Sequence, residues 1–148
     1  MEFKFNLNDQ CYNEMLYLYN DESIVSNGIN NFVLYLGDFT FGLSIDRESK
    51  RVRNFIGYSS NFMPTNFLKI PQARKGELFI NEVPEGDGVY YPNEYGFIAK
   101  GFYNIETGWY RVGEDCSTGD TVEIAINTLI NLEDGKIKAI YFKPIIAT

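Results

Sequence analysis

Alternation of apolar and polar residues with a period of two constrains this chain more than any other feature of its sequence. The pattern runs over residues 3–7, 39–45 and 122–132, where Phe, Leu, Val, Ile or Thr occupies every second position. Successive side chains of a β-strand point to opposite faces of a sheet, so this period predicts strands with one buried face. Alanine, the best helix former, occurs only five times, whereas Ile, Val, Thr, Phe and Tyr are plentiful. The composition therefore predicts a mainly β chain.

Turn signals divide the alternating runs. Asp134-Gly135 is a strong hairpin signal, and the return strand is expected over residues 136–143. A further strand is expected over residues 51–58. The cleanest run, 122–132, is predicted to be one continuous strand. Segment 59–77 contains two prolines and has no clear period, so it is predicted to be a long connection.

Residues 9–20 fit two structures. One is a helix with Asp9 as N-cap and an apolar face that includes Leu16 and Tyr19. The other is a strand, because Tyr17 and Tyr19 alternate with Leu16 and Leu18. We favour the strand, and both remain open.

The predicted architecture is a single domain over residues 1–148, since 148 residues is the usual size of one domain. Local hairpins favour an antiparallel β-sandwich or barrel of eight to ten strands, with at most one or two short helices. An α+β fold is the alternative. Ala125 and Leu129 lie on the otherwise polar face of the 122–132 run, so we expect a helix or another subunit to cover part of it, which leaves a homo-oligomer open.

Charge is sorted along the sequence. Residues 47–75 hold seven basic side chains and one acidic one, whereas residues 77–134 hold twelve acidic side chains and two basic ones, within a net charge of −7. Most of these acids fall in predicted turns, which gather at the ends of a sandwich or barrel, so we expect an acidic rim at one end. The net charge makes nucleic acid an unlikely ligand. Arg51 and Arg53 would share one strand face, and we expect the basic stretch to pair with the chain's own acids.

Several kinds of catalytic site are excluded by composition. The chain has no histidine, so Ser-His-Asp and Cys-His units cannot form. No phosphate-binding glycine motif is present. Cys11 and Cys116 belong to no metal-ligand pair, and the loop 115–120 departs from the EF-hand pattern. We therefore predict no catalytic residue, no metal site and no cofactor.

The leading functional hypothesis is a non-enzymatic acidic protein that docks on a basic protein partner. Bacterial immunity proteins that neutralise toxins share this general character, although no motif links them to this chain. The candidate binding residues comprise acids for attraction and aromatic side chains for desolvated anchors. They are Glu82, Glu85, Asp87, Tyr90, Tyr91, Glu94, Trp109, Tyr110, Glu114 and Asp115.

Two alternatives use the same residues differently. A small-molecule or carbohydrate-binding β-barrel would stack sugars on Tyr90, Tyr91, Trp109 or Tyr110, and two of the acids would make it a carboxylate-based hydrolase. A self-assembling subunit would use the apolar residues on both faces of 122–132.

The expected compartment is the cytoplasm. The polar residues Lys4 and Asn6 interrupt the start of the chain, so no signal peptide is expected. No apolar run approaches the roughly 20 residues that span a bilayer, so no membrane contact is expected. Two isolated cysteines fit a reducing environment.

Overall fold

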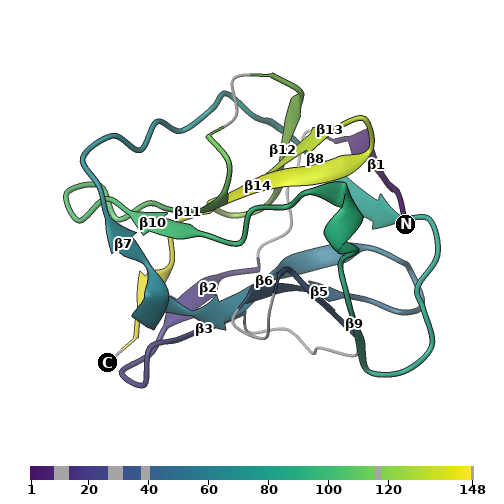
Figure 1. Ribbon diagram of the computed structural model, residues 1–148, viewed down its shortest axis with the longest axis horizontal. Helices are drawn as coiled ribbons and strands as arrows, with labels where there is room; N and C mark the ends of the chain where they lie inside the picture. The colour runs from purple at the N-terminus through teal and green to yellow at the C-terminus, as the bar shows by residue number, and fades with distance from the viewer. Residues whose placement is uncertain (9–13, 27–31, 38–40, 116–117, 148) are drawn as a thin grey trace.

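The computed structural model describes residues 1–8, 14–26, 32–37, 41–115 and 118–147. Two β-sheets pack face to face as a sandwich, seen edge-on in Figure 1. The predicted mainly β class is confirmed, and of the two predicted architectures the sandwich is formed and the closed barrel is not. The sheets are mixed, because four strand pairs run parallel while the other described pairs are antiparallel. None of the described helical segments is long and apolar enough to cross a membrane.

The two sheets have the following orders of neighbouring strands. The eight-stranded sheet contains β1 (Phe3–Leu7), β8 (Arg74–Ile80), β12 (Asp120–Ala125), β13 (Thr128–Glu133), β14 (Lys136–Phe142), β11 (Tyr110–Gly113), β10 (Gly101–Tyr103) and β7 (Met63–Pro64). The seven-stranded sheet contains β15 (Ile145–Ile146), β2 (Leu16–Leu18), β3 (Ser23–Ser26), β6 (Val52–Tyr58), β5 (Phe41–Ile45), β4 (Val33–Tyr35) and β9 (Gly88–Tyr90). Two 3₁₀ turns, η1 (Ser59–Asn61) and η2 (Asn93–Tyr95), complete the described elements.

The run 122–132 is a hairpin and not the single strand that its alternation predicts. Ala125 pairs with Thr128, and Asn127 reverses the chain at φ 56°. Asparagine tolerates this left-handed conformation better than most residues. Val122 pairs with Ile130, and both face the core. A register shift between Glu123 and Ala125 lets the reversal keep the period of two, and it turns Ala125, which was expected on the polar face, into the core beside Thr128. The predicted hairpin at Asp134-Gly135 is confirmed, with φ values of 53° and 75°.

Short strands form in several segments that lie between the longer ones. Leu16–Leu18 is a strand, as favoured, and residues 9–13 of the alternative helix lie outside the described residues. Segment 59–77 is not wholly a connection, because β7 forms within it and β8 begins at Arg74. The fifteen described strands exceed the predicted eight to ten, since connections add strands of two or three residues at the sheet edges.

Aromatic side chains join the two sheets. Phe55 of β6 stacks on Phe142 of β14 with ring centroids 4.4 Å apart, and Tyr110 stacks on the same Phe142 at 5.2 Å. Phe62 packs edge-on against Tyr110 at 5.1 Å. Stacked and edge-on arrangements suit the charge distribution of aromatic rings. Phenylalanine therefore fills much of the space between the sheets.

The outer face of the eight-stranded sheet is covered by the chain itself. Leu68 and Ile70 of the β7–β8 connection pack, with Trp109, against Leu129 and Tyr141. Figure 1 shows this connection crossing the side of the sheet that faces away from its partner sheet. The expected helix or second subunit over Leu129 is therefore replaced by an irregular segment of the same chain, which is long enough to reach across the strands.

Candidate functional site

Five segments meet at one end of the sandwich, here named the acidic end. They are residues 1–3, the β5–β6 turn 46–50, the loop 81–87, η2 and the hairpin 133–136. The backbone N–H of Asn81 donates to Glu2 (2.9 Å), that of Phe3 to Gly135 (3.0 Å) and that of Ile80 to Lys50 (2.9 Å). The terminal amine lies 3.3 Å from the Tyr95 hydroxyl of η2. In Figure 1 these segments gather on the right, around the N-terminus.

Nine carboxylates and three basic side chains lie in these segments. All but Asp46 among the acids are exposed. Within the described part of the chain, no salt bridge involves any of the eight exposed ones. The nine acids are Glu2, Asp46, Glu48, Glu82, Glu85, Asp87, Glu94, Glu133 and Asp134.

The three basic side chains of the acidic end contact backbone carbonyls and aromatic rings. Arg47 donates to the carbonyls of Pro84 (2.9 Å) and Gly86, and its guanidinium lies 5.1 Å over the Phe32 ring. Lys50 Nζ donates to the Asn81 carbonyl (3.4 Å), and Lys136 Nζ lies 4.5 Å over the Tyr95 ring. These contacts tie the loops together with cationic groups and leave the surrounding carboxylates facing solvent.

The predicted acids divide into two groups. Glu82, Glu85, Asp87 and Glu94 come together at the acidic end. Glu114 and Asp115 belong to the β11–β12 connection, where Asp115 lies 3.8 Å from Arg111. Five acids of this end were not among the candidate binding residues: Glu2, Asp46, Glu48, Glu133 and Asp134. The first three lie outside the acidic segment 77–134, and only their neighbours in space reveal their place.

The predicted aromatic anchors have different surroundings. Tyr90 is 46% exposed, whereas Tyr91 is 2% exposed and packs against Phe3, with its hydroxyl accepting the Ile137 N–H at 3.0 Å. Burial raises the pKa of Tyr91 to about 12 and also raises the pKa of Tyr110, which stacks in the core. Trp109 packs under the β7–β8 connection. Of the four, Tyr90 offers a partner the most open surface.

The basic stretch is dispersed over several parts of the structure. Arg47 and Lys50 lie in the acidic end. Arg51 and Arg53 bind Glu14, which is 9% exposed. Arg74 lies 3.6 Å from Asp120. The expected pairing with the chain's own acids is therefore seen for Arg51, Arg53 and Arg74, while Arg47 donates to backbone carbonyls.

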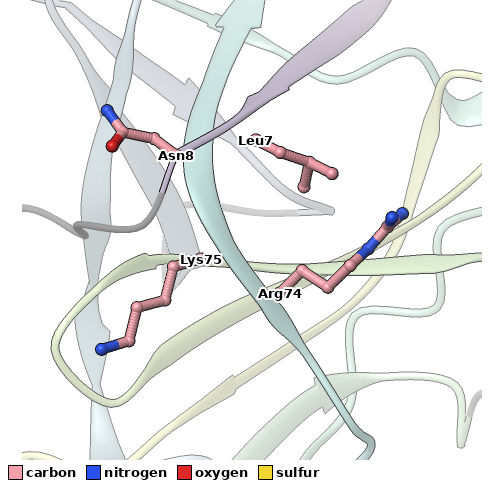
Figure 2. Close-up of a pocket in the computed structure, with 4 residues that line it drawn as sticks. All are labelled: Leu7, Asn8, Arg74 and Lys75. Carbon is pink, nitrogen blue, oxygen red and sulfur yellow. The ribbon is translucent and has the colours of Figure 1, made fainter.

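A surface hollow lies between the ends of β1 and β8. It encloses about 630 Å³ and is lined by Leu7, Asn8, Arg74 and Lys75. Figure 2 shows these side chains diverging, with Arg74 on the side of Leu7 and Lys75 on the side of Asn8. Because the two cations point apart, this open notch does not focus charge on one ligand.

A second cleft, of about 560 Å³, lies under the β7–β8 connection. Asn131 lines it and donates to the Thr118 carbonyl (3.2 Å) and the Thr121 hydroxyl (3.0 Å), whereas its Oδ1 has no hydrogen-bond partner among the described residues. Asp115 is the only acid among its described lining residues. No group of three or more Cys, Asp or Glu that could hold a metal occurs in the described residues. Cys11 and Cys116 lie outside them.

Two carboxylates, Asp120 and Asp134, line a notch of about 370 Å³ beside β1. The Asp120 side chain is 60% exposed and pairs with Arg74, and Asp134 is exposed. This notch lacks the buried environment that an acid catalyst needs. Comparisons with protein-family models, curated proteins and solved structures found no match.

Proposed function

We propose that this protein is a non-enzymatic binding protein whose acidic end docks on a basic protein partner, in the manner of an immunity or inhibitor protein. The proposal rests on one observation: eight exposed carboxylates share this end without a salt bridge to any described residue, while the local cations hold backbone carbonyls and rings. Acidic fields of this kind raise association rates of basic partners by about 10- to 1000-fold.

The chemistry of the partner follows from the charge. A nuclease or another nucleic-acid-binding protein carries a basic surface that matches the acidic end. Tyr90 lies on β9, which begins directly after Asp87, so a half-exposed aromatic ring stands beside the acids as an anchor. The cytoplasm is the compartment that this proposal assumes, because two cysteines outside any metal motif suit a reducing environment.

The test compares two variants that each remove three negative charges. The first is Glu82→Gln, Glu85→Gln and Glu94→Gln, at the acidic end. The second, the control, is Glu22→Gln, Glu106→Gln and Glu114→Gln; in Figure 1 the β2–β3 and β10–β11 turns, which carry Glu22 and Glu106, lie away from the acidic end. Tagged proteins are incubated with host lysate over a salt series, and captured proteins are identified by mass spectrometry.

We expect the wild-type protein and the control to capture the same basic protein, with capture falling steeply as salt rises. The acidic-end variant should lose it. Equal loss in both variants would show that only overall charge matters, and full capture by the acidic-end variant would contradict the proposal. Urea unfolding of each variant verifies that the fold is retained.

A further inference from the structure

An uncharged row of side chains crosses the outer face of the seven-stranded sheet. The strand registers align one residue from each of six neighbouring strands, since Tyr17 pairs with Val25, Ile56 with Gly42, and Tyr35 with both Gly42 and Tyr90. The β3–β6 register places Val25 beside Ile56 and so joins the two halves. In strand order, the row is Tyr17, Val25, Ile56, Gly42, Tyr35 and Tyr90.

This face is aromatic and open. Tyr19, Tyr58 and Tyr90 are 44%, 49% and 46% exposed, and the rings of Tyr35 and Tyr90 lie 5.6 Å apart. The outer face of an antiparallel sheet is ordinarily polar when it meets water. The eight-stranded sheet covers its outer apolar residues with the β7–β8 connection. Within the row itself, Tyr90 is exposed and Tyr17, Val25, Ile56 and Tyr35 are half-buried. Part of this aromatic face is therefore open to solvent, as interaction surfaces are.

A notch interrupts the row at Gly42. It encloses about 180 Å³, and its described lining residues, which include Ser23, Tyr35 and Tyr58, carry no charge. A Cβ at position 42 would lie 2.8 Å from Val33 Cγ1 and 3.3 Å from Ile56 Cγ2. Glycine therefore keeps the notch open, and the volume suits a single six-membered ring.

The dimensions of the row decide between ligand classes. Six strands at roughly 4.8 Å spacing make it about 24 Å long, and two residues along a strand make it about 7 Å wide. A stable protein interface needs about 800 Å² from each partner, several times the area of this row. The row is thus too narrow for a second copy or a globular partner, and it fits one extended chain lying across the strands.

We propose that this row binds a neutral polysaccharide, with one pyranose ring in the notch at Gly42. The C–H groups on the flat face of a sugar carry slight positive charge and pack on the negative face of an aromatic ring. Tyr58 lines the notch, and its hydroxyl is the group that would bond the sugar edge, since the Ser23 hydroxyl already donates to Asp21 at 2.5 Å. The absence of charge in the row disfavours a phosphate polymer, which requires basic contacts. The proposal shares Tyr90 with the docking proposed for the acidic end but uses none of the carboxylates there.

The test is affinity electrophoresis of the full chain in gels that contain one neutral polysaccharide each: hydroxyethylcellulose, xylan, glucomannan, laminarin or amylose. We expect retardation by at least one of them. Tyr35→Ala and Tyr90→Ala should each weaken binding at least tenfold in calorimetry with the matching oligosaccharide. Phe67→Ala removes an 88% exposed ring on the β7–β8 connection and should leave binding unchanged, as should the triple Glu→Gln variant of the acidic end.

Retardation by none of the five polysaccharides would overturn the proposal, as would full binding by the two tyrosine variants. Decaproline is also titrated, because extended proline-rich chains dock in aromatic grooves. If decaproline binds, Tyr35→Ala weakens that binding and no polysaccharide binds, then the ligand of the row is a peptide and the proposal is refuted. Urea midpoints of the variants confirm that a loss of binding is not a loss of fold.

Discussion

Arg53 binds Glu14 through two nitrogen atoms, with Nε 2.7 Å and Nη2 2.6 Å from the same carboxylate oxygen, Oε1. Arg51 reaches that oxygen at 3.4 Å. The Glu14 side chain is 11% exposed, so this acid neutralises part of the basic stretch inside the fold. The pairing accounts for two of the seven basic side chains of residues 47–75, whereas Lys50, Lys69, Arg74 and Lys75 are exposed.

Glu14→Gln is expected to lower the free energy of unfolding by about 3 kcal/mol, because it leaves two partly buried guanidinium groups without their carboxylate. The measurement is urea unfolding monitored by Trp109 fluorescence. Glu48→Gln, at an exposed carboxylate, is the control and should change stability by less than about 0.5 kcal/mol. Similar small changes in both variants would show that the ion triad contributes little to stability.

The raised pKa of Tyr91 should make the free energy of unfolding depend on pH in the alkaline range. Burial raises its pKa from 10.0 to about 12, so the folded chain holds the phenolic proton more tightly than the unfolded chain. The stabilisation linked to this proton is fully present below about pH 10. The free energy of unfolding should fall by roughly 2 kcal/mol as the pH rises from about 10 to about 12. Unfolding midpoints in urea should therefore fall across this interval.

Tyr91→Phe should remove most of that fall. It should also lower stability at neutral pH by about 1 kcal/mol, because the buried Ile137 N–H loses its acceptor. Urea unfolding of both proteins between pH 7 and pH 11.5 provides the comparison. Parallel pH profiles for the wild-type protein and the variant would contradict the assignment to Tyr91.

The β7–β8 connection is expected to protect the outer face of the eight-stranded sheet. Leu68→Ser with Ile70→Ser removes two half-buried side chains from Leu129 and Tyr141. Stability should fall by about 2 kcal/mol, and the uncovered patch should bind a hydrophobic dye. Phe67→Ser, at an 88% exposed position on the same connection, should do neither. A double variant indistinguishable from Phe67→Ser would show that the connection is not a cover.

Light scattering of the same double variant tests self-association. The apolar residues on this face suggested another subunit, and in the structure the chain itself lies on them. The wild-type protein should therefore not associate through this face, whereas the variant should associate as its concentration rises. If the wild-type protein forms oligomers that the double variant cannot form, the connection itself is part of a subunit interface.

The sequence by itself determined the β class, the hairpin at Asp134-Gly135 and the composition of the charged segments. These properties are local: side-chain alternation, turn-forming residues and glycine at positive φ act within a few residues. The break at Asn127 escaped prediction because the hairpin keeps the same alternation as a continuous strand, so the pattern of apolar residues cannot distinguish the two.

Only the tertiary structure decided which distant residues share a surface. Glu48 and Glu82 are far apart in sequence, yet Lys50 bonds to Asn81 and brings their loops together at the acidic end. The registers of two strand pairs, β4–β9 and β4–β5, place Tyr90 in line with Tyr35 and Gly42, and nothing within these segments specifies the pairing. Surfaces of this kind arise from long-range strand pairing, whose partners depend on how the whole core packs and not on the residues near each strand in the chain.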